Sequence, residues 1–287
     1  MAQRQKPAFY PDLKDQVALV IGAGQSGDPN SKVWGNGAAI AKTLSSSGAR
    51  IIACDLNLEA AKRTAHRIQA DGGFCKTHQL DATNAVDIKR VVDAVVTEYG
   101  RIDILINNVG LTKTGDPATM PEEAWDAQFQ LNLKTVYLAC RAVLPIMERQ
   151  GSGSIVNNAS VAGMRFLGKP QVAYATAKAA VIHFTKITAV MYANKGVRVN
   201  SVSPGMIYTP LLEMLGNSDS PEDREIHQKI TDHNVPLGCM GDAFDVANCV
   251  AFLASNSSRY VIGQNLVLDG GLTSSTGTGG VAPLSRL

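Results

Sequence analysis

The chain has 287 residues, of which 45% are hydrophobic and 18% are charged, and its formal net charge at pH 7 is +2. This composition is typical of one large α/β domain and excludes a disordered or fibrous chain. The small, scattered positive charge argues against a nucleic-acid partner. No apolar run is long enough to span a membrane, and the start MAQRQKPAFYPDLKD lacks the apolar region of a signal peptide. Five cysteines without CxxC spacing favour reduced thiols in an intracellular protein.

Short β-branched runs alternate with segments of helical length along the whole chain. They predict strands at 16–21, 50–54, 74–80, 102–107, 154–159, 197–203 and 265–269. Such alternation predicts right-handed crossovers and one doubly wound parallel sheet between two layers of helices, with ligands at the carboxyl ends of the strands. We expect one domain at 15–272, a loose arm at 1–14 and a mobile Gly/Ser/Thr-rich tail at 273–287.

Two glycine patterns follow the first predicted strand. Gly22, Gly24 and Gly27 match GxGxxG, the glycine pattern that binds a dinucleotide cofactor between a strand and a helix. The next residues, DPNS, are however unsuited to the interior of that helix. Gly35 and Gly37 instead lead directly into the helical sequence AAIAKTLSSSG. We therefore predict that a phosphate group lies at the helix after Gly37.

Asp55, at the end of the second predicted strand, supports the later glycine pair. It follows Gly37 by 18 residues and Gly27 by 28, and a spacing of about 20 is usual. We therefore infer that about ten residues, at 25–34, are inserted between the two parts of the glycine motif. The insertion forms either a flap over the cofactor, with Lys32 near phosphate and Trp34 packed on it, or a solvated surface excursion.

Asp55 also bears on the choice of cofactor. Its carboxylate is placed to accept hydrogen bonds from the adenosine ribose and would repel a 2′-phosphate, which predicts NAD(H) over NADP(H). The cation of Lys32 would instead attract a phosphate, so NADP(H) stays an alternative cofactor. The alternative for Asp55 is an aspartate that only caps the next turn.

Tyr174 and Lys178 stand four residues apart in the Ala-rich, proline-free stretch YATAKAAVIHF. On a helix this spacing places both side chains on one face. A neighbouring cation in a partly desolvated cleft would lower the pKa of the phenol from about 10 toward neutrality. Ser160 ends the strand just upstream. We expect Tyr174 to exchange protons at neutral pH.

With these motifs, the chain resembles the short-chain dehydrogenase/reductase family over roughly residues 14 to 272. The likeness rests on the expanded glycine motif, NNVG at 107–110, Asn132, Ser160, YATAK at 174–178 and SPGMIYT at 203–209. It implies a Rossmann-type fold and hydride transfer between a nicotinamide cofactor and a secondary alcohol or ketone. The catalytic tetrad that it implies is Asn132, Ser160, Tyr174 and Lys178. Tyr174 would be the general acid or base, and Ser160 would hold the substrate oxygen. Lys178 would bind the nicotinamide ribose, and Asn132 would hold a water that links Lys178 to solvent.

The same resemblance assigns further cofactor contacts. They are Gly22, Gly35 and Gly37 at the phosphates, Asp55 at the ribose, Asp81 beside the adenine, Asn107 and Gly110 along the cofactor, and Ile207 and Thr209 at the carboxamide. Three of them also have a plainer alternative: Asp81 begins a turn, Asn107 satisfies backbone groups, and Thr209 caps a helix.

The substrate is less clearly indicated. A mostly apolar pocket is predicted from side chains in two segments: Ala162, Met164, Phe166, Leu167, Gln171, Met206, Tyr208, Leu211 and Leu212. The alternative is that they pack in the core. The turn and helix signals within 209–235 predict a lid. Two other functions stay open: a 3-oxoacyl-thioester reductase or 3-hydroxyacyl dehydrogenase with Lys113, Arg165 and Lys169 at its entrance, and a non-catalytic NAD sensor. No metal site is expected, because His227 and His233 lack ligand spacing.

Two expectations concern the setting of the enzyme. By resemblance it forms a homodimer or homotetramer through the helices at 120–147 and 172–194 and the last strand. The terminal Ser285-Arg286-Leu287 is one conservative step from the peroxisomal signal Ser-Lys-Leu, so we expect a cytoplasmic or, in a eukaryote, a peroxisomal protein.

Overall fold

The computed structural model describes residues 8–28, 31–210, 231 and 234–276. Seven parallel strands form its main sheet in the order β3-β2-β1-β4-β5-β6-β9. The strands are β1 (Val17–Ile21), β2 (Arg50–Asp55), β3 (Cys75–Gln79), β4 (Ile104–Asn107), β5 (Gly153–Asn158), β6 (Val197–Pro204) and β9 (Asn265–Leu268). The predicted seven-stranded, doubly wound sheet is confirmed.

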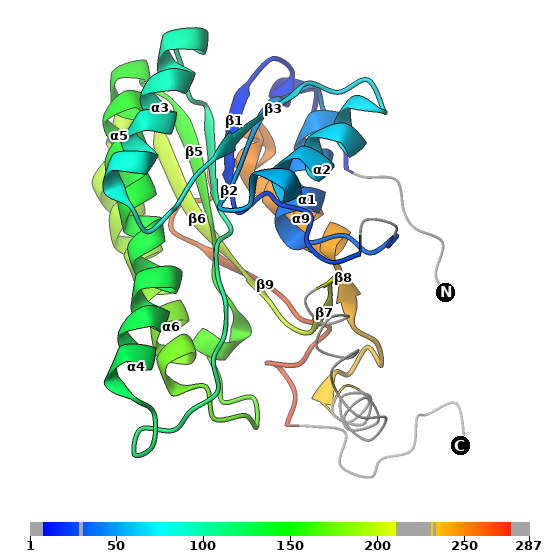
Figure 1. Cartoon of the computed structure of the whole chain (residues 1–287), viewed down its shortest axis with the longest axis vertical. Helices are drawn as coiled ribbons and strands as arrows, with labels where there is room; N and C mark the ends of the chain where they lie inside the picture. The colour runs from blue at the N-terminus through cyan, green and yellow to red at the C-terminus, as the bar shows by residue number, and fades with distance from the viewer. Residues whose placement is uncertain (1–7, 29–30, 211–230, 232–233, 277–287) are drawn as a thin grey trace.

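Helices cover both faces of the sheet and make three layers (Figure 1). One layer holds α3 (Ala85–Tyr99), α4 (Glu122–Phe129), α5 (Thr135–Gln150) and α6 (Val172–Tyr192). The other holds α1 (Asn36–Ser46), α2 (Leu58–Gln69) and α9 (Ala243–Ala254). Each face of the sheet has its own buried apolar cluster, because strands covered on both sides are apolar throughout.

Local sequence signals set several helix ends. The Asn57 side chain accepts a hydrogen bond from the backbone N–H of Ala60 at the start of α2, and Asn84 does the same for Val86 and Asp87 at the start of α3. Asp242 and Asp245 form a reciprocal capping box at the start of α9. Left-handed glycines end α3 and α5.

The strand register brings polar strand ends together at one edge of the sheet. Ile21 of β1 pairs with Asn107 of β4, and Asn107 pairs with Asn157 of β5. The residues that follow these strands therefore lie side by side. This edge is where ligands of doubly wound sheets bind.

Three features differ from the sequence-based expectations. A short parallel pair, β7 (Ile207–Tyr208) with β8 (Gly241–Asp242), lies outside the main sheet. Residues 8–14, expected within a loose arm, are docked: Leu13 is fully buried, and the backbone N–H of Tyr10 donates to Ser47 Oγ. At the other end, the Thr273 N–H donates to Asp269, so the first tail residues are also held.

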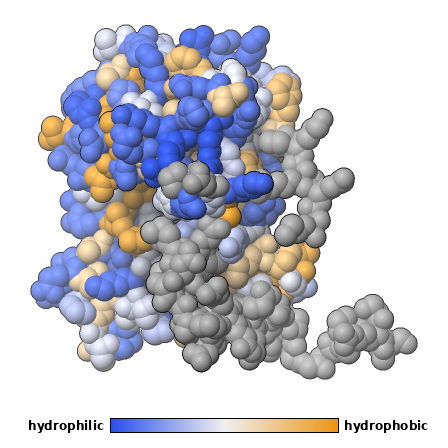
Figure 2. All heavy atoms as spheres, turned by 45° about the vertical axis from the view of Figure 1, so that its right-hand side comes forward, coloured by the Kyte–Doolittle hydropathy of each residue, from blue (hydrophilic) through white to orange (hydrophobic). Residues whose placement is uncertain are grey.

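Figure 2 shows the molecule turned so that the right-hand side of Figure 1, with α1 and α2, comes forward. Hydrophilic side chains cover most of the upper half of this view. Within the described ranges, no helix is long and apolar enough to cross a membrane. All five cysteines are free, and burial raises the pKa of the Cys75 and Cys140 thiols to about 12.

Candidate active site

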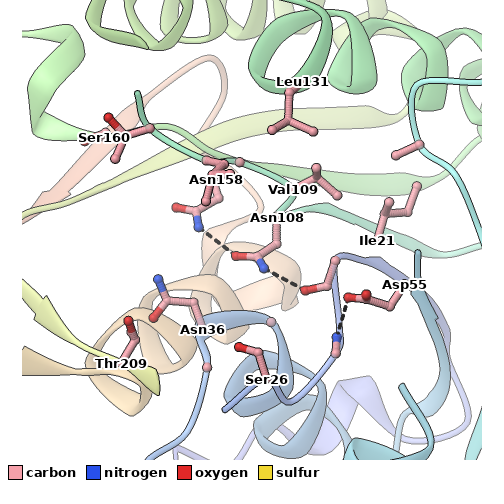
Figure 3. Close-up of a pocket in the computed structure, with 18 of the residues that line it drawn as sticks. Ile21, Ser26, Asn36, Asp55, Asn108, Val109, Leu131, Asn158, Ser160 and Thr209 are labelled. Atoms are coloured by element: carbon pink, nitrogen blue, oxygen red, sulfur yellow. Dashed lines mark hydrogen bonds between the residues drawn. The ribbon is translucent and has the colours of Figure 1, made fainter. Parts of the chain in front are cut away.

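A cleft of about 470 Å³ opens at the carboxyl edge of the sheet. It gathers eleven of the sequence-predicted site residues, which come from α1, β2, α6, the short strand β7 and the loops after β1, β3, β4, β5 and β7. These are Gly22, Gly35, Gly37, Asp55, Asp81, Gly110, Ser160, Tyr174, Lys178, Ile207 and Thr209. Figure 3 shows Asp55, Ser160 and Thr209 around this cleft, together with Ser26 and Asn36.

The glycine turn is shaped by close backbone approach. Gly22 has a φ of 82°, a conformation that favours glycine. At Gly37 a Cβ would lie 1.9 Å from the carbonyl oxygen of Gly22, so only glycine fits where α1 meets the turn. Gly35 is the N-cap of α1, and Gly35, Asn36 and Gly37 line the cleft at the start of this helix. The predicted role of the later glycine pair as the start of this helix is confirmed.

A buried side chain, Gln25, holds the two ends of the segment 25–34 together by hydrogen bonds. Gln25 is fully buried; its Nε2 donates to the Val33 carbonyl at 2.8 Å, and its Oε1 accepts from the Gly35 N–H at 3.1 Å. Arg63 donates to the Gln25 carbonyl at 2.9 Å. These bonds tie the beginning of the insertion to its end and to α2.

Trp34 does not line the cleft and packs on α9 instead, which fits neither of the two alternatives for the insertion, a flap packed on the cofactor or a solvated excursion. Its ring lies edge-on to Phe244 of α9, with centroids 5.4 Å apart, and the Arg67 guanidinium lies 4.8 Å above it. Neither Trp34 nor Lys32 lines the cleft, whereas Ser26 does. The indole packs here because α9 offers an apolar partner that solvent does not.

Two aspartates, Asp55 and Asp81, stand at one end of the cleft. Asp55 Oδ2 accepts from the Gly24 N–H at 2.8 Å, and Oδ1 accepts from the Asn57 N–H at 3.0 Å. Asp81 Oδ1 accepts from Thr83 N–H at 2.9 Å and from its hydroxyl at 2.7 Å. Both carboxylates are thus fixed in direction while they still line the cleft.

Tyr174, Ser160 and Lys178 meet at the opposite end. The Ser160 Oγ accepts from the Ala162 N–H at 3.1 Å, which sets the serine at the start of a short 3-10 turn. Lys178 is almost completely buried, and its Nζ donates to the Asn158 carbonyl at 2.8 Å. The same Nζ lies 5.8 Å from the centre of the Tyr174 ring. The helical spacing therefore does bring phenol and amine into one pocket.

The acidity of this pair differs from the expectation. Burial raises the pKa of Tyr174, while its hydrogen bond with Ser160 opposes that rise. Burial lowers the pKa of Lys178 to about 8. The prediction of a lowered phenol pKa counted the nearby cation but not the cost of desolvating both charges, and desolvation is the larger effect in this cleft.

Asn132 is fully buried in a π-helical turn, Gln130–Lys134, between α4 and α5. Its Oδ1 accepts from the Leu111 N–H at 3.2 Å, and its Nδ2 donates to the Leu111 carbonyl at 3.0 Å. Asn132 Oδ1 and Lys178 Nζ each lie 3.0 Å from the point that a Cβ of residue 110 would occupy. The structure thus places Asn132 behind the cleft and beside the lysine.

Asn107 and Asn108 face opposite sides of the sheet. The Asn107 amide donates to Asn157 Oδ1 at 2.8 Å within the core, and Asn107 does not line the cleft. Asn108 does line it, and its Nδ2 donates to the Gly22 carbonyl at 2.8 Å. The structure therefore does not bring the side chain of Asn107 to the predicted cofactor position.

The predicted substrate residues do not form one wall. Ala162, Phe166, Leu167 and Gln171 line a second hollow of about 420 Å³. Met164 and Tyr208 are exposed, and Met206 packs beside the small apolar cluster Val161, Val235 and Leu272. Leu211, Leu212 and most of the predicted lid lie outside the described residues. Loop residues of this kind are placed by tertiary contacts that no sequence spacing encodes.

Several cleft residues were missed by the motifs. Asn158 and Asn108 form an amide bridge across the cleft floor, and Ser26, Asn36, Leu111 and Thr112 also line it. The repeated Asn-Asn doublets at 107–108 and 157–158 were the available signal, because adjacent parallel strands place equivalent positions side by side.

Comparisons with known proteins agree with this geometry. A family model described as enoyl-(acyl carrier protein) reductase matches residues 32–273. The chain is 38% identical over 261 residues to the 3-oxoacyl-(acyl-carrier-protein) reductase of Thermotoga maritima, covering 91% of this chain and 98% of the relative. It is 38% identical over 263 residues to the 2-(R)-hydroxypropyl-CoM dehydrogenase of Xanthobacter autotrophicus, covering 90% and 98%.

A solved structure agrees as well. A short-chain dehydrogenase/reductase from Burkholderia xenovorans superposes with a TM-score of 0.87 at 41% identity, covering 92% of this chain and 98% of that one. These relatives, and a D-threitol dehydrogenase of Mycolicibacterium smegmatis that is 35% identical over 272 residues, are named as dehydrogenases and reductases. With the glycine turn, Ser160, Tyr174 and Lys178 in one cleft, the chain belongs to the short-chain dehydrogenase/reductase family and is a nicotinamide-dependent oxidoreductase of secondary alcohols and ketones.

Proposed function

We propose that the protein is an NAD(H)-preferring dehydrogenase of a secondary alcohol, with Tyr174 as its general acid and base. The observation that carries this proposal is the convergence of Ser160, Tyr174 and Lys178 in the cleft that also contains Asp55 and the glycine turn. Dinucleotide-binding and proton-transfer groups thus share one continuous space.

In the proposed mechanism, Ser160 hydrogen-bonds the substrate oxygen while Tyr174 removes the hydroxyl proton or returns it. The bound nicotinamide supplies the hydride acceptor or donor. Lys178 binds a ribose hydroxyl, and its ammonium form favours the phenolate of Tyr174. Because burial lowers the pKa of Lys178 to about 8, only part of the lysine is protonated near pH 8. Asn132, whose Oδ1 faces the same point beside Gly110 as the lysine, would hold the water that links Lys178 to solvent.

The residues present fit a dinucleotide. Glycine at 37 leaves backbone room at the N-terminus of α1, where any Cβ would collide with Gly22, and such a terminus favours a phosphate. The Asp55 carboxylate, held by the Gly24 N–H, supports NAD(H), because its charge opposes a 2′-phosphate.

A secondary alcohol or ketone of modest polarity is the proposed substrate. Leu111, Leu131 and Val109 add apolar side chains to the lining of the cleft. Two observations favour a 3-oxoacyl thioester as the second candidate. The Thermotoga maritima relative is named a reductase of that class, and Arg165 and Lys169 line the hollow beside Phe166. These cations suit an anionic carrier group.

The test is NADH formation from NAD⁺ with secondary alcohols of graded size and a 3-hydroxyacyl-CoA, beside NADP⁺ and the Tyr174→Phe variant. Turnover that falls at least ~100-fold in the variant, with NADH binding retained, supports the mechanism. Undiminished turnover in Tyr174→Phe would remove the tyrosine from its role. NADH binding without turnover of any alcohol, thioester or ketone would instead support a sensing protein.

Assembly and location complete the proposal. We expect a homodimer or homotetramer; exposed Ile187, Val190 and Met191 on α6 provide apolar surface for it. Light scattering that gives a monomer mass at micromolar concentration would contradict this. The terminal tripeptide lies outside the described residues. A fluorescent reporter fused to residues 273–287 tests the peroxisomal prediction, which diffuse cytosolic signal in eukaryotic cells would refute.

A further inference from the structure

The inserted segment 25–34 packs against a distant part of the chain, the segment that follows β7. A Cβ on Gly27 would lie 2.8 Å from the Cβ of Pro210, so the Gly27 backbone lies directly against the proline ring. Gly27 belongs to the loop after β1, whereas Pro210 comes after β6 and β7. Because β4 and β5 lie between β1 and β6 in the sheet, this contact joins two segments that the sheet keeps apart.

Both segments carry residues that line the cleft. Ser26, next to Gly27, lines it, and so do Thr209 and Pro210. Figure 3 shows Ser26 and Thr209 on either side of Asn36, the first residue of α1. The contact therefore joins the two segments that flank the start of this helix.

The inserted segment is firmly anchored to α2. Arg63 Nε donates to the Gln25 carbonyl at 2.9 Å, and Arg67 Nη2 donates to the Ser31 carbonyl at 2.9 Å. The buried Gln25 amide adds its bonds to the far end of the same segment. A displacement at Gly27 would have to break several of these bonds.

The inserted segment and the β7 segment also share a base at the start of α9. Ile207 of β7 pairs with Gly241 of β8, and α9 begins directly after β8. Trp34 of the inserted segment packs edge-on against Phe244 in the first turn of α9. All three large side chains, those of Trp34, Ile207 and Phe244, pack on the same apolar cluster. The two segments thus rise from one support and meet again at the Gly27 contact.

The sheet places the start of the Pro210 segment on the side of the cleft that carries Ser160. This segment follows β6, which pairs with β5, and Ser160 comes directly after β5. Asp55 ends β2, on the opposite side of β1. A shift of Pro210 would therefore disturb the half of the cleft that holds the reacting groups, and leave the half at Asp55.

We propose that Gly27 is a positioning residue: its contact with Pro210 braces Ile207–Thr209 in the cleft, where this stretch binds the nicotinamide half of the dinucleotide. The inserted segment is then neither a cover for the cofactor nor a surface excursion, but a support for the opposite wall. The inference rests on the proposed function, because it requires a dinucleotide in this cleft.

Gly72 provides a matched control for the backbone. Its φ is 77° and that of Gly27 is 80°, so alanine strains both positions alike. Gly72 lies in an exposed turn after α2, and within the described part of the chain no atom lies within 4 Å of the place that its Cβ would take. Gly27→Ala and Gly72→Ala therefore separate the lost contact from the strained backbone.

The experiment measures dissociation constants for NADH and for ADP, which lacks the nicotinamide half, by fluorescence and calorimetry on the full chain. In Gly27→Ala the anchored segment stays, and Pro210 moves with Thr209. The NADH constant should rise by about 10-fold, while the ADP constant should stay within about 2-fold. Gly72→Ala should leave both constants within about 2-fold. The melting temperature should fall in both variants, because alanine disfavours a positive φ.

A double-mutant cycle tests the contact itself. Pro210→Gly removes the atom that a Cβ at position 27 would strike. Gly27→Ala should therefore raise the ratio of the NADH constant to the ADP constant by about 10-fold in the wild-type background and by less than about 2-fold in Pro210→Gly. Pro210→Gly alone loses the brace and should also raise this ratio, so it tests the proposal if Gly27→Ala does not fold.

Three results would overturn the inference: a ratio in Gly27→Ala equal to that in Gly72→Ala, an equal loss of NADH and ADP, or an equal cost of Gly27→Ala in both backgrounds. If Gly27→Ala does not fold, an unchanged ratio in Pro210→Gly would do the same. A wild-type protein that binds neither NADH nor NADPH would instead refute the proposed function.

Discussion

At the scale of single residues, burial governs the chemistry of Lys178. The ammonium of Lys178 is buried, and within the described structure it donates to one acceptor, the Asn158 carbonyl. Because burial disfavours the charged form, the pKa of Lys178 falls from an ordinary 10.5 to about 8. The unfolded chain therefore binds this proton more tightly than the folded one does. Folding stability rises as pH increases from about 8 to 10.5, and the cost of the buried charge is fully present below pH 8.

We expect Lys178→Met to stabilise the cofactor-free protein below pH 8 by about 3 kcal/mol, from the pKa difference alone. The gain should shrink between pH 8 and 10.5, as the wild-type amine loses its proton. Urea unfolding of both proteins at pH 7.5 and 10 measures it. Lys62→Met, at an exposed lysine paired with Glu59, is the control and should show no such trend. A gain that is independent of pH would contradict burial of the charge.

A second residue-scale prediction concerns Asp55. Asp55→Asn removes the charge and keeps the size of the side chain, so the repulsion of a 2′-phosphate should disappear. The ratio of kcat/KM for NADPH to that for NADH should rise by at least ~10-fold. The repulsion between two unit charges in contact near a protein surface is about 4 kcal/mol before screening by salt, which is more than this change requires. Steady-state kinetics with both cofactors measures it. An unchanged ratio would leave Asp55 only its bonds to Gly24 and Asn57.

At the scale of elements, the inserted loop depends on Gln25. Its amide joins Val33 and Gly35, so it fixes where α1 begins relative to β1. Gln25→Ala leaves these backbone groups without their partner. We expect NADH binding to weaken by about 10-fold or more, with kcat at saturating cofactor nearly unchanged.

Gln25→Glu is the matched variant for this loop. It places a carboxylate in a fully buried site against the Val33 carbonyl, so its NADH affinity should fall at least as far as that of Gln25→Ala. Fluorescence titration compares the three proteins. If all three bind NADH equally, the loop does not set the geometry of the nucleotide site.

At the scale of the whole molecule, residues 8–14 close the layer that holds α1 and α9. Leu13 is fully buried there, whereas Phe9 in the same segment is 66% exposed. Leu13→Ala should lower the free energy of unfolding by 2–5 kcal/mol, a typical cost of a core truncation, and Phe9→Ala should change it by less than ~1 kcal/mol. Chemical denaturation checks both. Equal, small losses would show that the segment is loose in solution.

The sequence by itself determined the fold and the proximity of Tyr174 and Lys178. Buried parallel strands are continuous apolar runs, and the spacing of Tyr174 and Lys178 is a local helical property, so both are encoded within short windows. The same holds for the start of α1 at the Gly35–Gly37 motif. Only the tertiary structure decided the rest. The facing of Asn107 and Asn108, the turning of Trp34 toward α9, the separation of the substrate residues and the desolvation of Lys178 depend on neighbours distant in sequence. Burial and strand register arise from the assembled layers, and no local pattern records them.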